Sequence, residues 1–205
     1  MNASQGERRA AATEKLPQLF MLRPALDGLP ALDLPAGCTL RTFRKGDQGA
    51  WNAMMDAAFE RKPGTTDFEK AMRADPEFRP ERVQIIERAG EVVATASAWF
   101  NARYGPHAGY VHWVGTHPAH RGLKLGHWAS VAALQHMKRE GRRVAVLHTD
   151  DFRLAALKIY LALGFGPCVH HESHRARWPK VLAALSWPER FEPALNGDLV
   201  TFPLA

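Results

Sequence analysis

The chain has 205 residues, of which 46% are hydrophobic and 23% are charged, and this is enough apolar material for one hydrophobic core. Its two cysteines exclude a disulfide scaffold and indicate a reduced, cytoplasmic protein. The formal net charge of +6 suits an anionic ligand, whereas dispersed basic residues without a recognition motif disfavour nucleic acid as a partner.

The first segments predict a tail and an arm. Residues 1–15 are polar and lack an apolar stretch, so we expect a disordered tail rather than a secretory signal. Residues 16–37 are expected to form an N-terminal arm, with a short strand over 18–23 and then a loop with three prolines. No window is long and apolar enough for a transmembrane helix, and we expect no membrane partner.

Residues 38–185 carry alternating strand and helix patterns, and residues 186–205 are expected to be a C-terminal tail. The strand patterns fall at residues 39–43, 83–88, 92–100, 110–116, 143–148 and 165–170. The helix patterns fall at residues 47–59, 67–73, 122–140, 152–163 and 174–185.

The most informative segment joins the strand at 110–116 to the long helix. A glycine-bearing turn that opens a helix directs several free backbone N–H groups at one point, where the helix dipole is positive. Arg121 and Lys124 add two charges there, and Gly126 lies in the first helical turn. This combination predicts a pyrophosphate site; the alternative for Lys124, a solvated surface charge, is less favoured because Arg121 lies one turn away at the same anion site.

This segment resembles the pyrophosphate loop of the GCN5-related N-acetyltransferase (GNAT) family, Gln/Arg-x-x-Gly-x-Gly/Ala. Arg121 matches the first position and Gly126 the last, while Lys124 stands where the family has its first glycine. Residues 156–165 match a second signature, Ala-x-x-x-Tyr-x-x-x-Gly-Phe, although Arg153 replaces the Asn that often precedes it by three residues. The resemblance covers roughly residues 39–170 and is greatest to the acetyltransferase halves of mycothiol-synthase-type enzymes.

The resemblance implies a fold and a cosubstrate. The fold is α/β, a mixed, mostly antiparallel twisted sheet flanked by helices, in which the strands on either side of the long helix diverge. The cosubstrate is acetyl-CoA, and the implied contacts are Val114, Gly115, Thr116, Arg121, Gly122, Leu123, Lys124, Leu125 and Gly126. Gly115 within a strand also indicates a bulge or a close backbone approach, or simply the end of the strand before Pro118.

The resemblance also implies catalytic residues. Tyr160 lies at the family position for a general acid that protonates the leaving thiolate; on its own it would be a half-buried aromatic residue. The implied oxyanion donors are backbone N–H groups at Val114 or Thr116. For the base, His112 and His148 are the candidates, with Asp150 and a water-mediated route left open.

Several alternatives remain at this stage. Short histidine spacings at 117–120 and 170–174 lack a completing ligand set, so we expect no metal. The chain is expected to acetylate a primary amine, and the other reading is a degenerate module that binds CoA or a protein partner without turnover. Neither the acceptor nor the oligomeric state follows from the sequence, and a homodimer is one state that it allows.

Overall fold

The computed structural model describes residues 16–188. Its strands are β1 (Leu19–Arg23), β2 (Cys38–Thr42), β3 (Val83–Arg88), β4 (Glu91–Trp99), β5 (Ala108–Thr116), β6 (Val144–Thr149) and β7 (Gly166–Cys168). Its α-helices are α1 (Gln48–Ala58), α2 (Leu125–Arg139), α3 (Leu154–Ala162) and α4 (Glu172–Ala184), and a short π-helical segment spans Glu69–Arg73.

The strands form one seven-stranded sheet in the order β2-β3-β4-β5-β6-β1-β7. Every neighbouring pair is antiparallel except β5 and β6, which are parallel. The connection from β5 to β6 passes through α2, as a parallel pair requires. The predicted fold class, a mixed and mostly antiparallel sheet flanked by helices, is confirmed.

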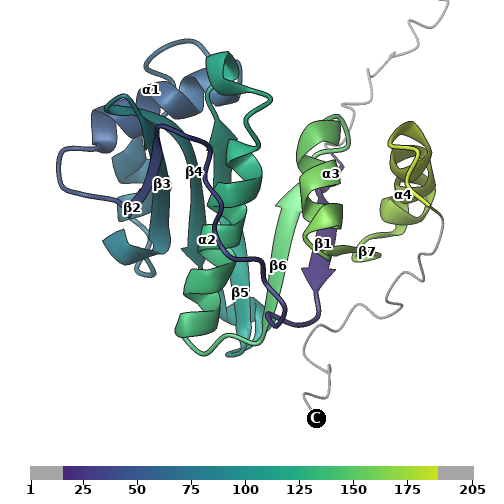
Figure 1. Cartoon of the computed structure of the whole chain (residues 1–205). Helices are drawn as coiled ribbons and strands as arrows, with labels where there is room; N and C mark the ends of the chain where they lie inside the picture. The colour runs from purple at the N-terminus through teal and green to yellow at the C-terminus, as the bar shows by residue number, and fades with distance from the viewer. Residues whose placement is uncertain (1–15, 189–205) are drawn as a thin grey trace, which may run out of the picture.

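Helices cover both faces of the sheet (Figure 1). On one face, the buried side chains of α2, α3 and α4 share a core with alternate residues of the strands, including Ala94, Ala96 and Ala98 of β4. On the other face, α1 and the π-helical segment enclose an aromatic core with Val83 and Ile85 of β3. Alternate side chains along the strands therefore pack into separate cores on the two faces, and a third, smaller cluster contains Phe20, Tyr104 and Val146.

Strand β1 lies inside the sheet, whereas the sequence pattern predicts an arm outside the domain. It pairs with β6 over its whole length, from Leu19 opposite Thr149 to Arg23 opposite Ala145, and with β7 on its other edge. All four side chains from Leu19 to Leu22 are buried: Leu19 and Met21 join the core under α2, whereas Phe20 and Leu22 join the smaller cluster with Tyr104 and Val146. A continuous apolar run indicates a strand that is covered on both faces, but the run does not reveal which strands pair with it.

Element ends differ modestly from the predictions. Helix α2 begins at Leu125 rather than at residue 122, because Gly122 and Lys124 have left-handed backbone angles that a helix excludes. Helix α4 begins at Glu172, where the His171 side chain accepts a hydrogen bond from the backbone N–H of Ser173. Of the predicted C-terminal tail, only residues 186–188 are among the described residues, and the predicted tail at 1–15 lies outside them.

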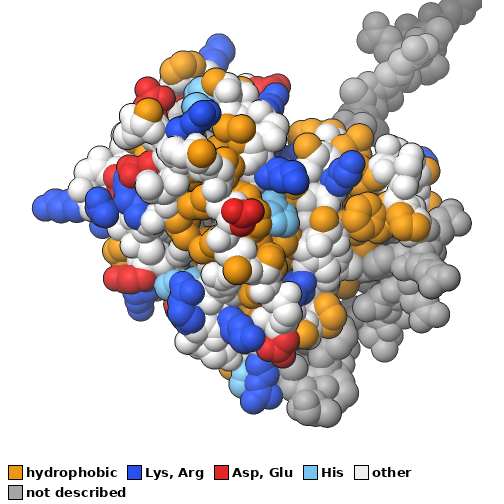
Figure 2. All heavy atoms as spheres, in the orientation of Figure 1, with side chains coloured by type: hydrophobic (Ala, Val, Ile, Leu, Met, Phe, Trp, Pro, Cys, Tyr) orange, Lys and Arg blue, Asp and Glu red, His pale blue; other side chains and the backbone are white. Residues whose placement is uncertain are grey.

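Basic side chains are scattered over the face seen in Figure 2 and do not form one patch. No helix among residues 16–188 is both long and apolar enough to cross a membrane.

The position of β1 makes a stability prediction. Leu19 is fully buried, so Leu19→Ala should lower the free energy of unfolding by about 2–5 kcal/mol, the range for a truncated core leucine. The control is Leu16→Ala, three residues earlier, because the Leu16 side chain is 54% exposed. Denaturant titration of both variants measures the difference. Equal stabilities would mean that β1 is a dispensable arm.

Candidate active site

A gap opens between β5 and β6 in the middle of the sheet. The two strands pair only from Ala108 opposite Val144 to Tyr110 opposite Val146. Beyond that point β5 continues to Thr116 and β6 continues to Thr149, but the two strands no longer pair with each other. The predicted divergence of these strands is therefore present.

Strand β5 carries a β-bulge at the edge of this gap. Thr95 pairs with Gly115 and Ser97 with His112, so that two steps along β4 match three along β5. Trp113 lies within the bulge and has a φ of +47°, a left-handed conformation that is rare for an aromatic residue. Such strain is typical of functional sites, where a bulge redirects backbone groups and side chains.

Gly115 is required by close packing behind the bulge. A Cβ atom at this position would lie 2.7 Å from the Sδ atom of Met55 and 3.3 Å from the Cβ atom of Ala58, both in α1. The structure thus shows both features that the sequence pattern indicates for Gly115, a bulge and a close approach, and the approaching element is α1.

The turn after β5 presents free backbone donors. The backbone N–H groups of residues 122–126 have no protein acceptor within residues 16–188. Lys124 precedes α2 with a φ of +55°, and Gly126 is so close to Thr116 that a Cβ atom would lie 3.0 Å from its Oγ1. Arg121 extends from the same turn and forms an exposed ion pair of 3.3 Å with Glu60.

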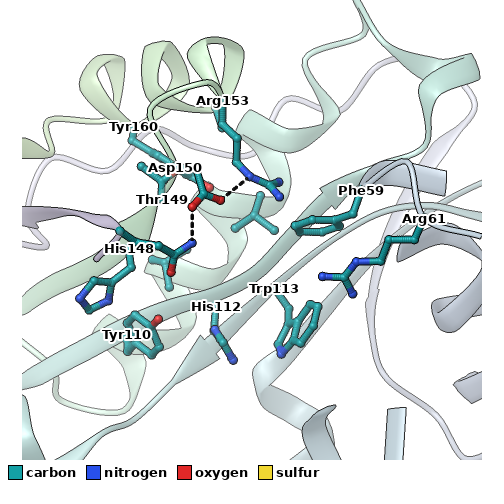
Figure 3. Close-up of a pocket in the computed structure, with 14 residues that line it drawn as sticks. Phe59, Arg61, Tyr110, His112, Trp113, His148, Thr149, Asp150, Arg153 and Tyr160 are labelled. Carbon is teal, nitrogen blue, oxygen red and sulfur yellow. Dashed lines mark hydrogen bonds and ion pairs between the residues drawn. The ribbon is translucent and has the colours of Figure 1, made fainter. Parts of the chain in front are cut away.

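Two cavities meet at the gap. The first, here called the loop cavity, is lined by the end of β5, the turn and α3, including Thr116, Arg121 and Gly126. The second, here called the strand cavity, lies between β5 and β6 and is drawn in Figure 3. The residues that line both cavities are Val114, Arg153 and Ala156.

Asp150 and Arg153 form an ion pair on one wall of the strand cavity. The Arg153 Nε atom donates to Asp150 Oδ2 at 3.0 Å, and Gln18 Nε2, just before β1, donates to Asp150 Oδ1 at 3.1 Å. The Arg153 guanidinium also stacks on the Phe59 ring, 4.2 Å from its centroid. This contact joins α3 to the end of α1 across the gap, as Figure 3 shows.

Two histidines line the strand cavity in their neutral form. Burial lowers the pKa of His112 to about 4, and burial together with nearby cationic groups lowers the pKa of His148 to about 4. Tyr160 also lines this cavity, and its buried position raises the pKa of its phenol well above the usual value. All three side chains are therefore uncharged at neutral pH.

Comparisons with known proteins agree with this geometry. The sequence pattern of the acetyltransferase (GNAT) family matches residues 50–165. The chain belongs to the GNAT family.

Two curated relatives, both named mycothiol acetyltransferase, are similar to this GNAT chain. The protein of Thermobispora bispora is 36% identical over 154 residues, covering 71% of this chain and 52% of the relative. That of Thermomonospora curvata is 33% identical over 153 residues, covering 72% and 50%. The chain thus spans about half the length of these relatives. A solved GCN5-related N-acetyltransferase from Sphaerobacter thermophilus has a TM-score of 0.55 and 25% identity, covering 74% of this chain and 49% of that one.

The structure brings most of the predicted GNAT site residues together. Of the expected cofactor contacts, all except Leu123 line the loop cavity, and Leu123 instead packs against the core. Tyr160, His112 and His148 all line the strand cavity. Their roles stay predictions. Among residues 16–188, no three His, Cys, Asp or Glu side chains are grouped so that they could hold a metal ion.

The sequence patterns did not identify several residues of the strand cavity as site residues. Phe59 and Arg61 follow the end of α1, Trp113 lies in the bulge, and Gln18 precedes β1. Lys124 has a left-handed backbone, which glycine adopts without strain, and this explains why the family has glycine at this position. Only the family comparison at Lys124 could have indicated that conformation.

Lys124 allows its charge and its backbone to be tested separately. Lys124→Gly and Lys124→Ala both remove the ammonium group, but only glycine relieves the left-handed strain, which is roughly 1–2 kcal/mol for other residues. We expect the glycine variant to be the more stable by about 1 kcal/mol in denaturant titration, after glycine's extra unfolded-state entropy is offset. Calorimetry with CoA should show the same few-fold loss of affinity for both. A loss of hundreds-fold would mean that Lys124 anchors the ligand.

The histidines predict how stability depends on pH. His112 has a pKa of about 4 in the folded protein and 6.5 as its ordinary value. As pH falls from about 6.5 to about 4, the unfolded chain takes up protons that the folded protein refuses, so stability falls across this window. His112→Gln should make that fall less steep in denaturant titrations at several pH values. The exposed His107 provides the control variant His107→Gln, and equal slopes for both variants would contradict the assignment.

Proposed function

We propose that this chain is an N-acetyltransferase that transfers an acetyl group from acetyl-CoA to a primary amine. The supporting observation is the meeting of two cavities at Val114, Arg153 and Ala156. One cavity has the chemistry for a pyrophosphate, and the other has uncharged acid and base groups. A donor that enters through the first and an acceptor that enters through the second would meet where β5 and β6 diverge.

The residues of the turn fit the cosubstrate. Free N–H groups at residues 122–126, the N-terminus of α2 and the side chains of Arg121 and Lys124 would hold the pyrophosphate. The ion pair of Arg121 with Glu60 is exposed and therefore weak, so a phosphate can displace it. Acetyl-CoA supplies a thioester whose carbonyl carbon is attacked by the amine.

The chain's own residues would handle charge and protons. Backbone N–H groups at Val114 or Thr116 would stabilise the oxyanion, and the supporting observation is that Val114 lines both cavities. His112 and His148 are neutral and can accept a hydrogen bond from the amine. Because their pKa values are about 4, they bind the proton weakly, and it must pass on to solvent. Tyr160 remains protonated and can donate to the leaving thiolate.

The relatives' name suggests a first acceptor. Since they are named mycothiol acetyltransferase, the unacetylated precursor of mycothiol belongs in the first screen of amines. The second candidate function is a module that binds CoA without turnover, favoured by Lys124 and Arg153 at positions where the family has other residues. Release of free thiol during an acceptor screen, beside calorimetry with CoA, separates binding from turnover.

Tyr160→Phe tests the chemistry. The substitution keeps the ring and its packing against Phe165, so folding and CoA affinity should be unchanged. Single-turnover acetyl transfer should slow by roughly 10²–10⁴-fold, the range for one positioned proton donor. Tyr104→Phe removes the hydroxyl from a buried tyrosine that lines neither cavity and should leave the rate unchanged. A parental rate in the Tyr160 variant would reduce Tyr160 to a packing role.

A further inference from the structure

The charged groups of the strand cavity do not balance. The side chains that line it include one carboxylate, Asp150, and two guanidinium groups, Arg61 and Arg153. Asp150 is paired with Arg153 at 3.0 Å. No carboxylate within residues 16–188 lies within ion-pair distance of Arg61. The histidines add no negative charge, so the cavity carries one uncompensated positive charge.

Arg61 is held in place although its side chain is exposed. Its guanidinium carbon lies 5.0 Å from the Phe59 ring centroid and 5.8 Å from that of Trp113. Its Nη1 atom donates to Thr66 Oγ1 at 3.3 Å, and the backbone N–H of Thr66 donates to Asp56 at 2.8 Å. Contacts with two aromatic rings restrict a side chain that is otherwise long and flexible in solvent. The ordering of Arg61 is therefore provided before any ligand arrives.

The guanidinium is directed at the cavity. In Figure 3 it extends from the end of α1 into the space between Phe59 and Trp113, facing the wall formed by Asp150 and Arg153. Of the five N–H donors of Arg61, one is bonded to Thr66, and the other four have no acceptor among residues 16–188. A planar set of free donors matches the two oxygens of a carboxylate or phosphate.

We propose that the acceptor is an amine that also carries an anionic oxygen group, a carboxylate or a phosphate, and that Arg61 binds this group. The proposal rests on the proposed function, which supplies the amine chemistry, and it names the class of amine. A purely cationic amine would enter a cavity that already has a positive excess, which opposes its binding. An anionic group on the same molecule cancels that excess and fixes the amine's orientation.

The test compares matched acceptors. Each pair consists of an amine with a carboxylate and the same amine with a carboxamide in its place; a second pair compares an aminoalkyl phosphate with the corresponding amino alcohol. The wild-type protein should favour the anionic member by roughly 10- to 100-fold in kcat/KM, as expected for one charge-assisted hydrogen-bonded pair. Arg61→Gln should abolish this preference mainly through KM, and Arg61→Lys should retain part of it.

A matched control isolates the position of the charge. Lys62→Gln removes one positive charge at the next residue, which is exposed and does not line the strand cavity, and should keep the preference. Thermal melting should show that every variant is folded. Transfer to amines without any preference for the anionic member, or a preference that survives Arg61→Gln, would overturn the proposal and leave the acetyltransferase assignment standing.

Binding gives a readout without turnover. Calorimetry of the anionic amine, with CoA present, should show affinity that falls at least 10-fold in Arg61→Gln and not in Lys62→Gln. If this difference appears while no amine is acetylated, the proposed acetyl transfer fails and the anion site remains. If neither the anionic amine nor its neutral partner distinguishes the two variants, the anion site is absent.

Discussion

The binding site exists because β5 and β6 separate after only three paired residues, from Ala108 to Tyr110 of β5. Each strand has its outer edge paired, β5 with β4 and β6 with β1, so neither can move sideways to close the gap between them. The inner edges carry backbone groups that are left without a strand partner beyond Tyr110 and Val146. A sheet normally satisfies such groups, and their persistence in a defined opening creates a preformed binding site.

The bulge in β5 determines the shape of that opening. Trp113 adopts a left-handed backbone at a cost of order 1–3 kcal/mol, and its ring packs against Trp51 and Phe59, with centroids 5.5 and 6.0 Å away. The aromatic contacts offset the strain and connect the bulge to α1. Phe59 then contacts Arg153 on the far side of the gap. The end of α1 is thereby coupled to both cavities.

Local features of the site could be read from the sequence, and distant ones could not. The turn at Arg121–Gly126 and the helix with Tyr160 have short motifs, and the structure places them beside the two cavities. Strand β1 has a clear apolar pattern, yet its partners lie more than a hundred residues away, so its place in the sheet required the structure. Arg61 belongs to a loop without any motif, and its contacts with the rings of Phe59 and Trp113 in the strand cavity are visible only in the structure.

The location of β1 also constrains how the chain folds. Leu19 faces Thr149, and Phe20 faces Cys168, so this early strand acquires its neighbours only after almost all later elements exist. Contacts of such separation are slow to form, because a long loop must close before any pairing energy is gained. During synthesis, the apolar residues 19–22 must wait unpaired while β2 to β5 assemble as a local meander. The half of the sheet formed by β6, β1 and β7, next to Asp150 and Tyr160, is therefore the last to be completed.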